Sequence, residues 1–289
     1  MQTSGLRVVY TLTRFPVSLA VTFTALTAFI LSPAHLSLSA LIPIAGIFML
    51  ASGASAFNQY QEWPYDERME RTRKRPLPSR RISTAEALRI AMIFIIGGML
   101  LLLYYAPPVC FILGFANIMW YNGVYTYLKR VTAFAVVPGA LTGAIPILMG
   151  WTAGGGSLLA PEALFLAFFL FVWQMPHFWL LTLKYGHEYR QAGFPVLNDL
   201  FSEFRIRIVI MAWMTASAGA SIMLVYFKIL DHPALGFSLI GLNALLLLLI
   251  AWQLFVAPAM RYRLIFISAN LFMLTVMLSL IANRFLSIG

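Results

Sequence analysis

Nine long apolar runs, separated by polar residues, proline or glycine, dominate this 289-residue chain. A helix of about 20 apolar residues spans the hydrocarbon core of a bilayer, and it bonds its own backbone polar groups there. Strands of a membrane barrel would alternate in hydropathy, and these runs do not. Charged residues make up only 10% of the chain, against about a quarter in soluble domains. The sequence therefore excludes a soluble enzyme and predicts an all-α, polytopic membrane protein.

We expect these runs to form nine transmembrane helices within a single domain that covers residues 1–289. The predicted spans are residues 15–32, 37–57, 85–105, 108–127, 133–152, 162–183, 207–227, 234–255 and 264–282. Their ends are set by the polar and Pro/Gly breaks between the runs.

Positive charge falls almost entirely on one side of this predicted bundle. With the N-terminus inside, 18 of the 20 Lys and Arg lie on the inner side, because only Lys228 and Arg284 fall outside (20 − 2 = 18). The positive-inside rule expects this asymmetry. The net charge of +10 then reflects membrane orientation, and we expect no nucleic-acid partner. We expect a cell (inner) membrane protein with a cytoplasmic N-terminus, whose chemistry lies in the charged cytoplasmic loops 58–83 and 184–206.

The first of these loops opens with oxygen-bearing side chains at intervals of four, namely Asn58, Glu62, Asp66 and Glu70. On a helix this spacing places them along one slowly turning face. Carboxylates so arranged repel each other unless a cation neutralises them, and Mg²⁺ held by one or two carboxylates and substrate phosphates fits. We expect the helix to bend or end near Pro64.

A run of cations follows directly and includes Arg71, Arg73, Lys74, Arg75, Arg80 and Arg81. If the acids hold a metal, the arginines are suited to bind the outer oxygens of the same diphosphate. The alternative is a solvated run that acts only as a topology signal. Lys129 and Arg130 have the same two readings, as anion ligands or as anchors at the inner surface.

His177 lies inside the sixth apolar run, where an ionisable side chain is costly and usually faces an internal cavity. It is a candidate ligand or acid–base group, although a buried histidine that is merely hydrogen-bonded is the alternative. Glu188 follows eleven residues later, about three helical turns, so both can share a face. Gly186 weakens this inference.

Three segments carry a resemblance to a known family. Residues 58–78 read Asn-x-x-x-Glu-x-Pro-x-Asp-x-x-Met-x-Arg-Thr-x-x-Arg-Pro-Leu, residues 125–151 contain Leu-Lys-Arg and Gly-Ala-Ile-Pro, and residues 173–195 contain Trp-Gln-Met-Pro-His-Phe-Trp and Glu-Tyr-x-x-Ala-Gly. In content, order and spacing these segments resemble the protoheme IX farnesyltransferases (haem O synthases), a branch of the UbiA-type intramembrane prenyltransferases. The last three spans resemble this branch only in hydropathy.

The resemblance implies a UbiA-type helical bundle and a Mg²⁺-dependent prenyltransferase. The implied reaction joins farnesyl diphosphate to the vinyl group of haem B, with hydration, to give haem O. The implied metal ligands are Asn58, Glu62 and Asp66. The implied diphosphate ligands are Arg71 and Arg75, together with Lys129 and Arg130. On the haem side the resemblance leaves His177 as an axial ligand or orienting group, and Glu188 as an aid to metal, diphosphate or water.

The chain departs from the wider family at several positions. Many bacterial members have Asp in place of Glu62 and of Pro64, whereas the mitochondrial branch matches this chain at both. A second Asp-x-x-x-Asp motif is replaced here by Lys184-x-x-x-Glu188, which puts a second all-carboxylate Mg²⁺ site in doubt.

Other readings of the sequence stay open. One is a UbiA-type prenyltransferase that acts on a quinone precursor or a chlorophyll-like ring. Another is a membrane transporter, which would keep its polar site near the bilayer centre rather than in inner loops. A third is an inactive assembly partner of a terminal oxidase. Besides lipid, the open candidates for protein partners are a haem A synthase and terminal oxidase assembly factors.

Overall fold

The computed structural model describes residues 5–33 and 41–286, and all regular elements in these ranges are helices. They are α1 (Gly5–Leu12), α2 (Phe15–Leu31), α3 (Ile42–Asp66), α4 (Thr84–Tyr105), α5 (Pro108–Ile118), π-helix η2 (Met119–Tyr125), α6 (Thr126–Leu128), 3₁₀-helix η3 (Ala133–Ala135), α7 (Val136–Ala153), α8 (Pro161–Gln191), 3₁₀-helix η4 (Leu197–Asp199), α9 (Glu203–Tyr226), α10 (Pro233–Phe255) and α11 (Tyr262–Leu286). The predicted all-α class is confirmed.

The predicted count of nine spans is not confirmed. By length and apolar composition, six helices in the described ranges can cross a membrane, or seven if the bent pair α1–α2 forms one span. Two predicted spans fall short for local reasons. Helix α3 carries amides and carboxylates at its C-terminal end, and the span predicted at 108–127 is divided into α5, η2 and α6. The first residues of the span predicted at 37–57 lie outside the described residues.

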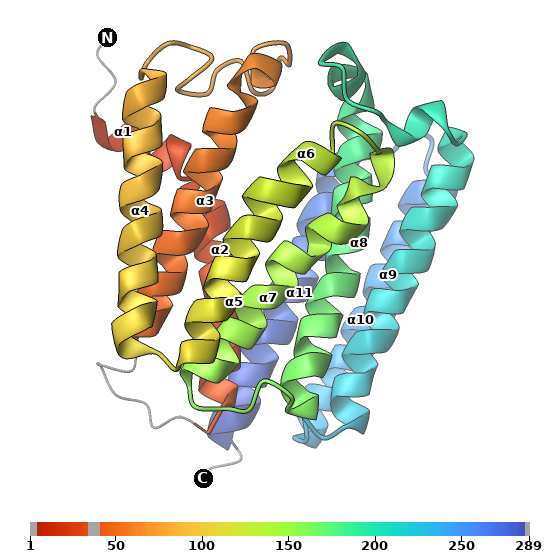
Figure 1. The fold of residues 1–289 in the computed structure, drawn as a ribbon. Coiled ribbons are helices and arrows are strands. Elements are labelled where there is room, and N and C mark those ends of the chain that lie inside the picture. The colour runs from red at the N-terminus through yellow and green to blue at the C-terminus, as the bar shows by residue number, and fades with distance from the viewer. Residues whose placement is uncertain (1–4, 34–40, 287–289) are drawn as a thin grey trace.

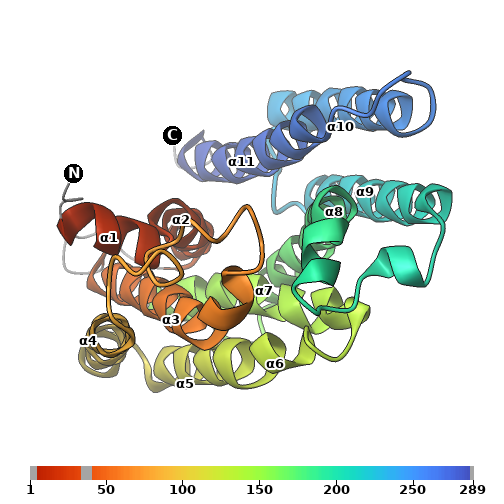
Figure 2. The same ribbon diagram turned by 90° about the horizontal axis from the view of Figure 1, so that it is seen from above.

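The long helices run side by side and form one bundle (Figure 1). Helix α7 packs against α2, α5 and α8, while α3 packs against α2 and α4, and α11 closes the bundle against α2, α8 and α10 (Figure 2). Many outward-facing side chains are large and apolar, such as Leu248 (69% exposed) and Ile93 (65%). Such a surface is suited to lipid, so the protein is a multi-pass membrane protein.

Both charged loops lie at the same end of the bundle as α1 (Figure 1). The first joins α3 to α4, and the second joins α8 to α9. Helix α3 continues through Pro64 and ends two residues later at Asp66. Helix α8 likewise continues through Gly186 to Gln191. A Cβ atom at Gly186 would lie 2.8 Å from Asn198 Oδ1, so this glycine admits the loop that follows the helix.

Helices α2 and α7 approach each other closely at Gly150. A Cβ atom there would lie 1.9 Å from the backbone oxygen of Ala25. Only glycine leaves space for this contact, as is common where membrane helices pack through small residues. Both helices also line an internal cavity, so this contact sets the distance between two of its walls.

Candidate active site

A cavity of about 370 Å³ lies inside the bundle and extends to the end that carries the charged loops. Its walls come from α2, α3, α5, η2, α7 and α8 and from the loops that follow α3 and α8. Its polar lining includes Arg14, Glu62, Asp66, Arg71, Arg75, Lys129 and Tyr189. Its apolar lining includes Val21, Ile47, Leu50, Ile118 and Met149. Because Ile47 and Asp66 lie on one helix, 19 residues apart, the lining spans about 28 Å along α3.

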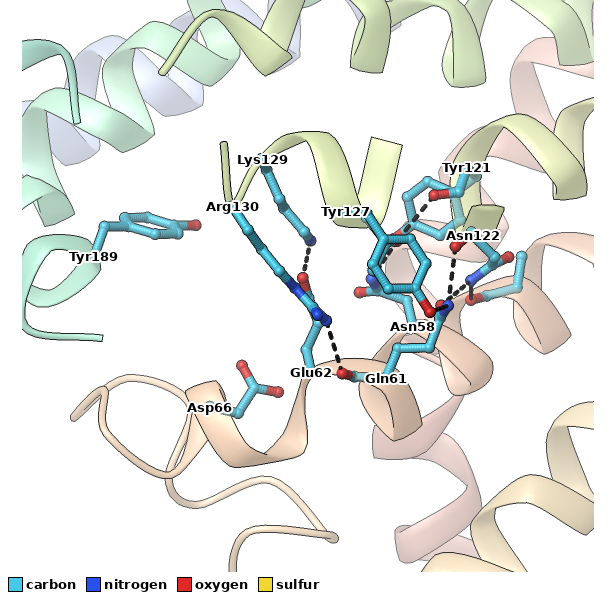
Figure 3. A network of polar contacts seen from close by, with 12 residues as sticks. Asn58, Gln61, Glu62, Asp66, Tyr121, Asn122, Tyr127, Lys129, Arg130 and Tyr189 are labelled. Carbon is cyan, nitrogen blue, oxygen red and sulfur yellow. Dashed lines mark hydrogen bonds and ion pairs between the residues drawn. The ribbon is translucent and has the colours of Figure 1, made fainter. Parts of the chain in front are cut away.

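Two carboxylates from the last turns of α3 form the acidic part of the polar lining. Glu62 is 5% exposed and Asp66 is 2% exposed. Arg75 Nη1 donates to both oxygens of Asp66, at 2.8 and 2.6 Å. Glu62 forms an ion pair with Lys129, and Figure 3 shows Lys129 reaching over it from the end of α6. Each buried carboxylate therefore has a cation as its partner, as buried charges require.

Burial and neighbouring charges shift the pKa values of Arg75 and Lys129. Burial lowers the pKa of Arg75 to about 10, helped by Arg14 and opposed by Asp66. Arg75 therefore stays charged at neutral pH. Burial also lowers the pKa of Lys129, which the charge of Glu62 opposes.

Asn58 and Glu70 do not join Glu62 and Asp66 at the cavity. Asn58 is fully buried and does not line it; Asn58 Oδ1 accepts from Arg14 Nη2 at 3.2 Å, and Asn58 Nδ2 donates to Thr126 Oγ1 at 2.9 Å. The expectation of one face for the whole row is wrong for Glu70. Because α3 ends at Asp66, Glu70 lies in the loop with its side chain 77% exposed.

Lys129 and Arg130 separate as well. Lys129 lines the cavity, whereas Arg130 does not. Arg130 Nη2 donates to the backbone oxygen of Gln61 at 3.0 Å, and its guanidinium lies over the rings of Tyr65 and Tyr127. In this structure Arg130 ties the end of α6 to α3.

The loop after α3 meets the end of α8 at Arg71, which lines the cavity. Its backbone N–H donates to Glu188 Oε2 at 2.9 Å, and its Nη2 donates to Tyr189 OH at 3.2 Å. Glu188 thus reaches the site without lining the cavity, whereas its neighbour Tyr189 does line it. The end of α8 therefore fixes the position of the loop that carries the cations.

His177 points away from the cavity and toward α11. Its ring centroid lies 4.5 Å from that of Phe266 and 5.4 Å from that of Trp173. In the described part of the chain, His177 Nδ1 has no hydrogen-bond partner. The next residue, Phe178, does line the cavity. The structure therefore does not bring His177 together with the carboxylates.

Several polar residues of the lining were not predicted from the sequence, among them Arg14, Tyr121, Tyr125 and Tyr189. Arg14 sits at the 53° bend between α1 and α2, in the left-handed backbone region (φ 46°) that non-glycine residues seldom adopt. In the sequence, an arginine directly before an apolar run indicates membrane topology and does not by itself indicate a cavity residue. The tyrosines carry no such signal, although the spacing of four from Tyr121 to Tyr125 to Lys129 hints at a shared face.

The donor set suits a hard cation that is completed by a ligand. Among the described residues, no three His, Cys, Asp or Glu side chains gather into a complete metal site. Two carboxylates one turn apart do line the cavity beside four cations. Mg²⁺ in proteins is usually held by one or two carboxylates together with substrate phosphates and water, so Glu62 and Asp66 fit it.

Known proteins match this chain both in sequence and in fold. Residues 19–280 match the UbiA prenyltransferase family. The chain is similar to a protoheme IX farnesyltransferase from Oleidesulfovibrio alaskensis, with 32% identity over 98% of this chain and 99% of that protein. It is also similar to the protein of the same name from Geobacter sulfurreducens, with 39% identity over 65% and 70% of the two chains.

Solved structures share the fold. A structure of digeranylgeranylglyceryl phosphate synthase superposes with a TM-score of 0.74 at 15% identity, covering 98% of this chain and 99% of that chain. A UbiA homologue from Archaeoglobus fulgidus, bound to DMAPP and Mg²⁺, superposes with a TM-score of 0.70 at 14% identity, covering 94% and 98%. The TM-scores indicate a shared bundle architecture. Identities this low carry no residue assignments.

Proposed function

Since this chain belongs to the UbiA prenyltransferase family, we propose that it transfers a farnesyl group from farnesyl diphosphate to a vinyl group of haem B, giving haem O. One observation carries the proposal: a cavity with buried carboxylates and cations at the loop-bearing end continues into an apolar interior. Such a cavity suits a long apolar chain with a charged head. The similarity over nearly the whole chain to proteins named protoheme IX farnesyltransferase supports haem B as the acceptor.

In this proposal Arg71, Arg75 and Lys129 bind the diphosphate and stabilise the charge that develops as it leaves. Mg²⁺ held by Glu62 and Asp66 would neutralise further charge on the same group. Asn58 stays our third candidate ligand, and its oxygen would have to leave Arg14 to serve. Arg130 stays a candidate at longer range, because in this structure it bonds to α3.

The proposed reaction needs no covalent enzyme nucleophile. The bond between the farnesyl carbon and the diphosphate oxygen breaks, and the bonding electrons leave with the diphosphate. The terminal vinyl carbon then bonds to the farnesyl carbon, which leaves positive charge on the vinyl carbon attached to the porphyrin. Water adds to that carbon and loses a proton. The chain's part is to hold both substrates in line and to keep water away until this last step.

On the haem side, His177 remains our candidate for the axial ligand or orienting group. Two observations support it: Nδ1 has no partner in the described residues, and the adjacent Phe178 lines the cavity. Glu188 is proposed to act by holding Arg71 in place, through the backbone hydrogen bond between them.

We further propose that the chain works as one domain in the cell (inner) membrane, with the cavity mouth facing the cytoplasm. The concentration of Lys and Arg in the loops at that end supports this orientation. Haem A synthase and terminal oxidase assembly factors remain candidate partners on the strength of the substrate chemistry alone.

The test is an assay of the purified protein with haem B, farnesyl diphosphate and Mg²⁺, in which mass spectrometry seeks the farnesylated, hydrated haem. We expect product with Mg²⁺ and none after chelation by EDTA. A parallel reaction replaces haem B with a quinone precursor. Product from the quinone precursor alone would replace our acceptor assignment, and no product from either would refute the enzyme.

A further inference from the structure

Residues 121–130 present two rows of side chains at intervals of four, and each row faces a different part of the molecule. One row lines the cavity and consists of Tyr121, Tyr125 and Lys129. The other row bonds to α3 or its side chains and consists of Asn122, Thr126 and Arg130. The first row belongs to the site already described. Apart from Arg130, which stays a candidate diphosphate ligand, the second row is used by no step of the proposed reaction.

Asn122 makes the most specific contacts of the second row. Its Nδ2 donates to Gln61 Oε1 at 3.0 Å and to the backbone oxygen of Ala54 at 3.1 Å. In return, Gln61 Nε2 donates to the backbone oxygen of Asn122 at 2.9 Å. Figure 3 shows Gln61 and Asn122 close together, to the right of the Glu62–Lys129 ion pair. Two amides thus join α3 to η2 by reciprocal hydrogen bonds.

The backbone at Asn122 is unusual, because η2 is a π-helix of seven residues within an otherwise α-helical rod. π-Helical segments are rare in proteins, and those that occur are often found at functional sites. A change of helical period alters the face on which the later side chains fall. The segment therefore bears on where Lys129 lies relative to the cavity.

Asn122 is buried, and its amide is only partly satisfied. It is 3% exposed, and in the described part of the chain its Oδ1 has no hydrogen-bond partner. A buried acceptor without a partner is destabilising, and this cost offsets part of the gain from the two hydrogen bonds of Nδ2. The amide supplies direction, because its hydrogen bonds hold η2 against α3 in one register.

We propose that the Gln61–Asn122 amide pair is a positioning device that holds Lys129 against Glu62 and so sets the geometry of the diphosphate end of the cavity. Gln61 precedes Glu62 directly, and Asn122 lies seven residues, about two helical turns, before Lys129. The pair joins the last turns of α3, which carry Glu62, to the η2–α6 segment that leads to Lys129. This inference rests on the proposed function of the same site.

The test removes the pair from either side, with Gln61→Met and Asn122→Leu. Binding of inorganic pyrophosphate in the presence of Mg²⁺ is measured by calorimetry on the purified full chain. We expect affinity to fall about five- to ten-fold, the effect of one lost buried hydrogen bond. In the enzyme assay, the KM for farnesyl diphosphate should rise while the KM for haem B stays unchanged. A purely structural role would not produce this split.

A double-variant comparison tests whether the pair acts through Lys129. We expect Lys129→Met to weaken pyrophosphate binding, and we expect Gln61→Met to add no further loss in that background. The matched control is Asn243→Leu, which removes a buried amide that bonds to Ser221 between α9 and α10. It should lower the melting temperature and leave pyrophosphate affinity unchanged.

Three outcomes would overturn the inference. Wild-type pyrophosphate affinity in folded Gln61→Met would refute it, and so would full additivity with Lys129→Met. Because Gln61 is only half-buried, this variant decides the question even if Asn122→Leu does not fold. If the unaltered protein failed to bind pyrophosphate with Mg²⁺, the proposed function and this inference would fall together.

Discussion

At the scale of single residues, charge pairing distinguishes side chains that the sequence presents as equivalent. Asp66 and Glu70 are both acids at the same spacing, yet Asp66 is 2% exposed beside Arg75 whereas the side chain of Glu70 is 77% exposed beside Arg73. A buried acid within a cavity has few competing water molecules, so its charge acts strongly on a bound ligand. An exposed acid in a loop is screened.

This contrast predicts the behaviour of two variants. Asp66→Asn should lower turnover at least about 100-fold, because it removes the charge that would hold a cation while the side chain keeps its shape. Glu70→Gln is the matched control and should leave turnover unchanged. Initial rates of haem O formation measure both, and thermal unfolding confirms that both proteins fold. Wild-type turnover in Asp66→Asn would exclude Asp66 as a metal ligand.

His177 gives a second prediction at the residue scale. It packs against Phe266 and Trp173 rather than beside the carboxylates, so its loss should not disturb the diphosphate end. We expect His177→Ala to weaken haem B binding, followed by the haem absorption spectrum, and to leave pyrophosphate affinity unchanged. Equal weakening of both ligands would indicate a general packing defect instead of a haem role.

At the scale of helices, the cavity depends on contacts that bring backbones close together. The contact of Gly150 with the backbone of Ala25 fixes α7 against α2, and residues of both helices, such as Val21 and Met149, line the cavity. Backbone atoms cannot move aside as the end of a flexible side chain can. One added methyl group at this position therefore separates two walls of the site.

We expect Gly150→Ala to destabilise the protein by about 1–3 kcal/mol, the usual cost of overpacking. Gly219→Ala is the control, because a Cβ atom at Gly219 in α9 meets nothing within 4 Å. Thermal unfolding in one detergent compares the two variants. A melting temperature of Gly150→Ala equal to that of the unaltered protein would show that α2 and α7 can separate without cost.

At the scale of the whole molecule, charge follows the long axis of the bundle. The start of α1 and the end of α11 lie at opposite ends of the bundle (Figure 1). Among the cations, only Lys228 and Arg284 fall at the end where α11 ends in the predicted topology. Cationic loops are retained on the cytoplasmic side during insertion. The bundle therefore has one end that is rich in cations and carries the proposed site, and one end with few charged residues.

This polarity predicts where reporter fusions are active. Alkaline phosphatase fused after the C-terminus should be active, because the enzyme folds only outside the cytoplasm, whereas a fluorescent protein at the same place should stay dark. A fusion placed after Arg81, in the loop between α3 and α4, should give the opposite pattern. A fluorescent C-terminal fusion would contradict the orientation.

Much of the architecture could be predicted from the sequence, because hydropathy and charge are properties of local segments. Apolar runs identify membrane helices wherever they pack, and the cations place both charged loops at one end. The residue motifs in those loops pointed to the family that the comparisons show. The count of nine spans is not confirmed, because polar residues or a change in helix type interrupt two of the runs, as in α3 and at η2.

The lining of the cavity was decided only by the tertiary structure. Which side of a helix faces the cavity depends on the helices packed around it, and spacing along the chain cannot supply that information. Helix α3 ends at Asp66, so Glu70 lies in the loop that follows. The bend at Arg14 places its guanidinium beside Asn58. The ring of His177 packs against Phe266 of α11 instead of lining the cavity. The sequence by itself determined which residues could do chemistry and at which end; packing determined which of them meet.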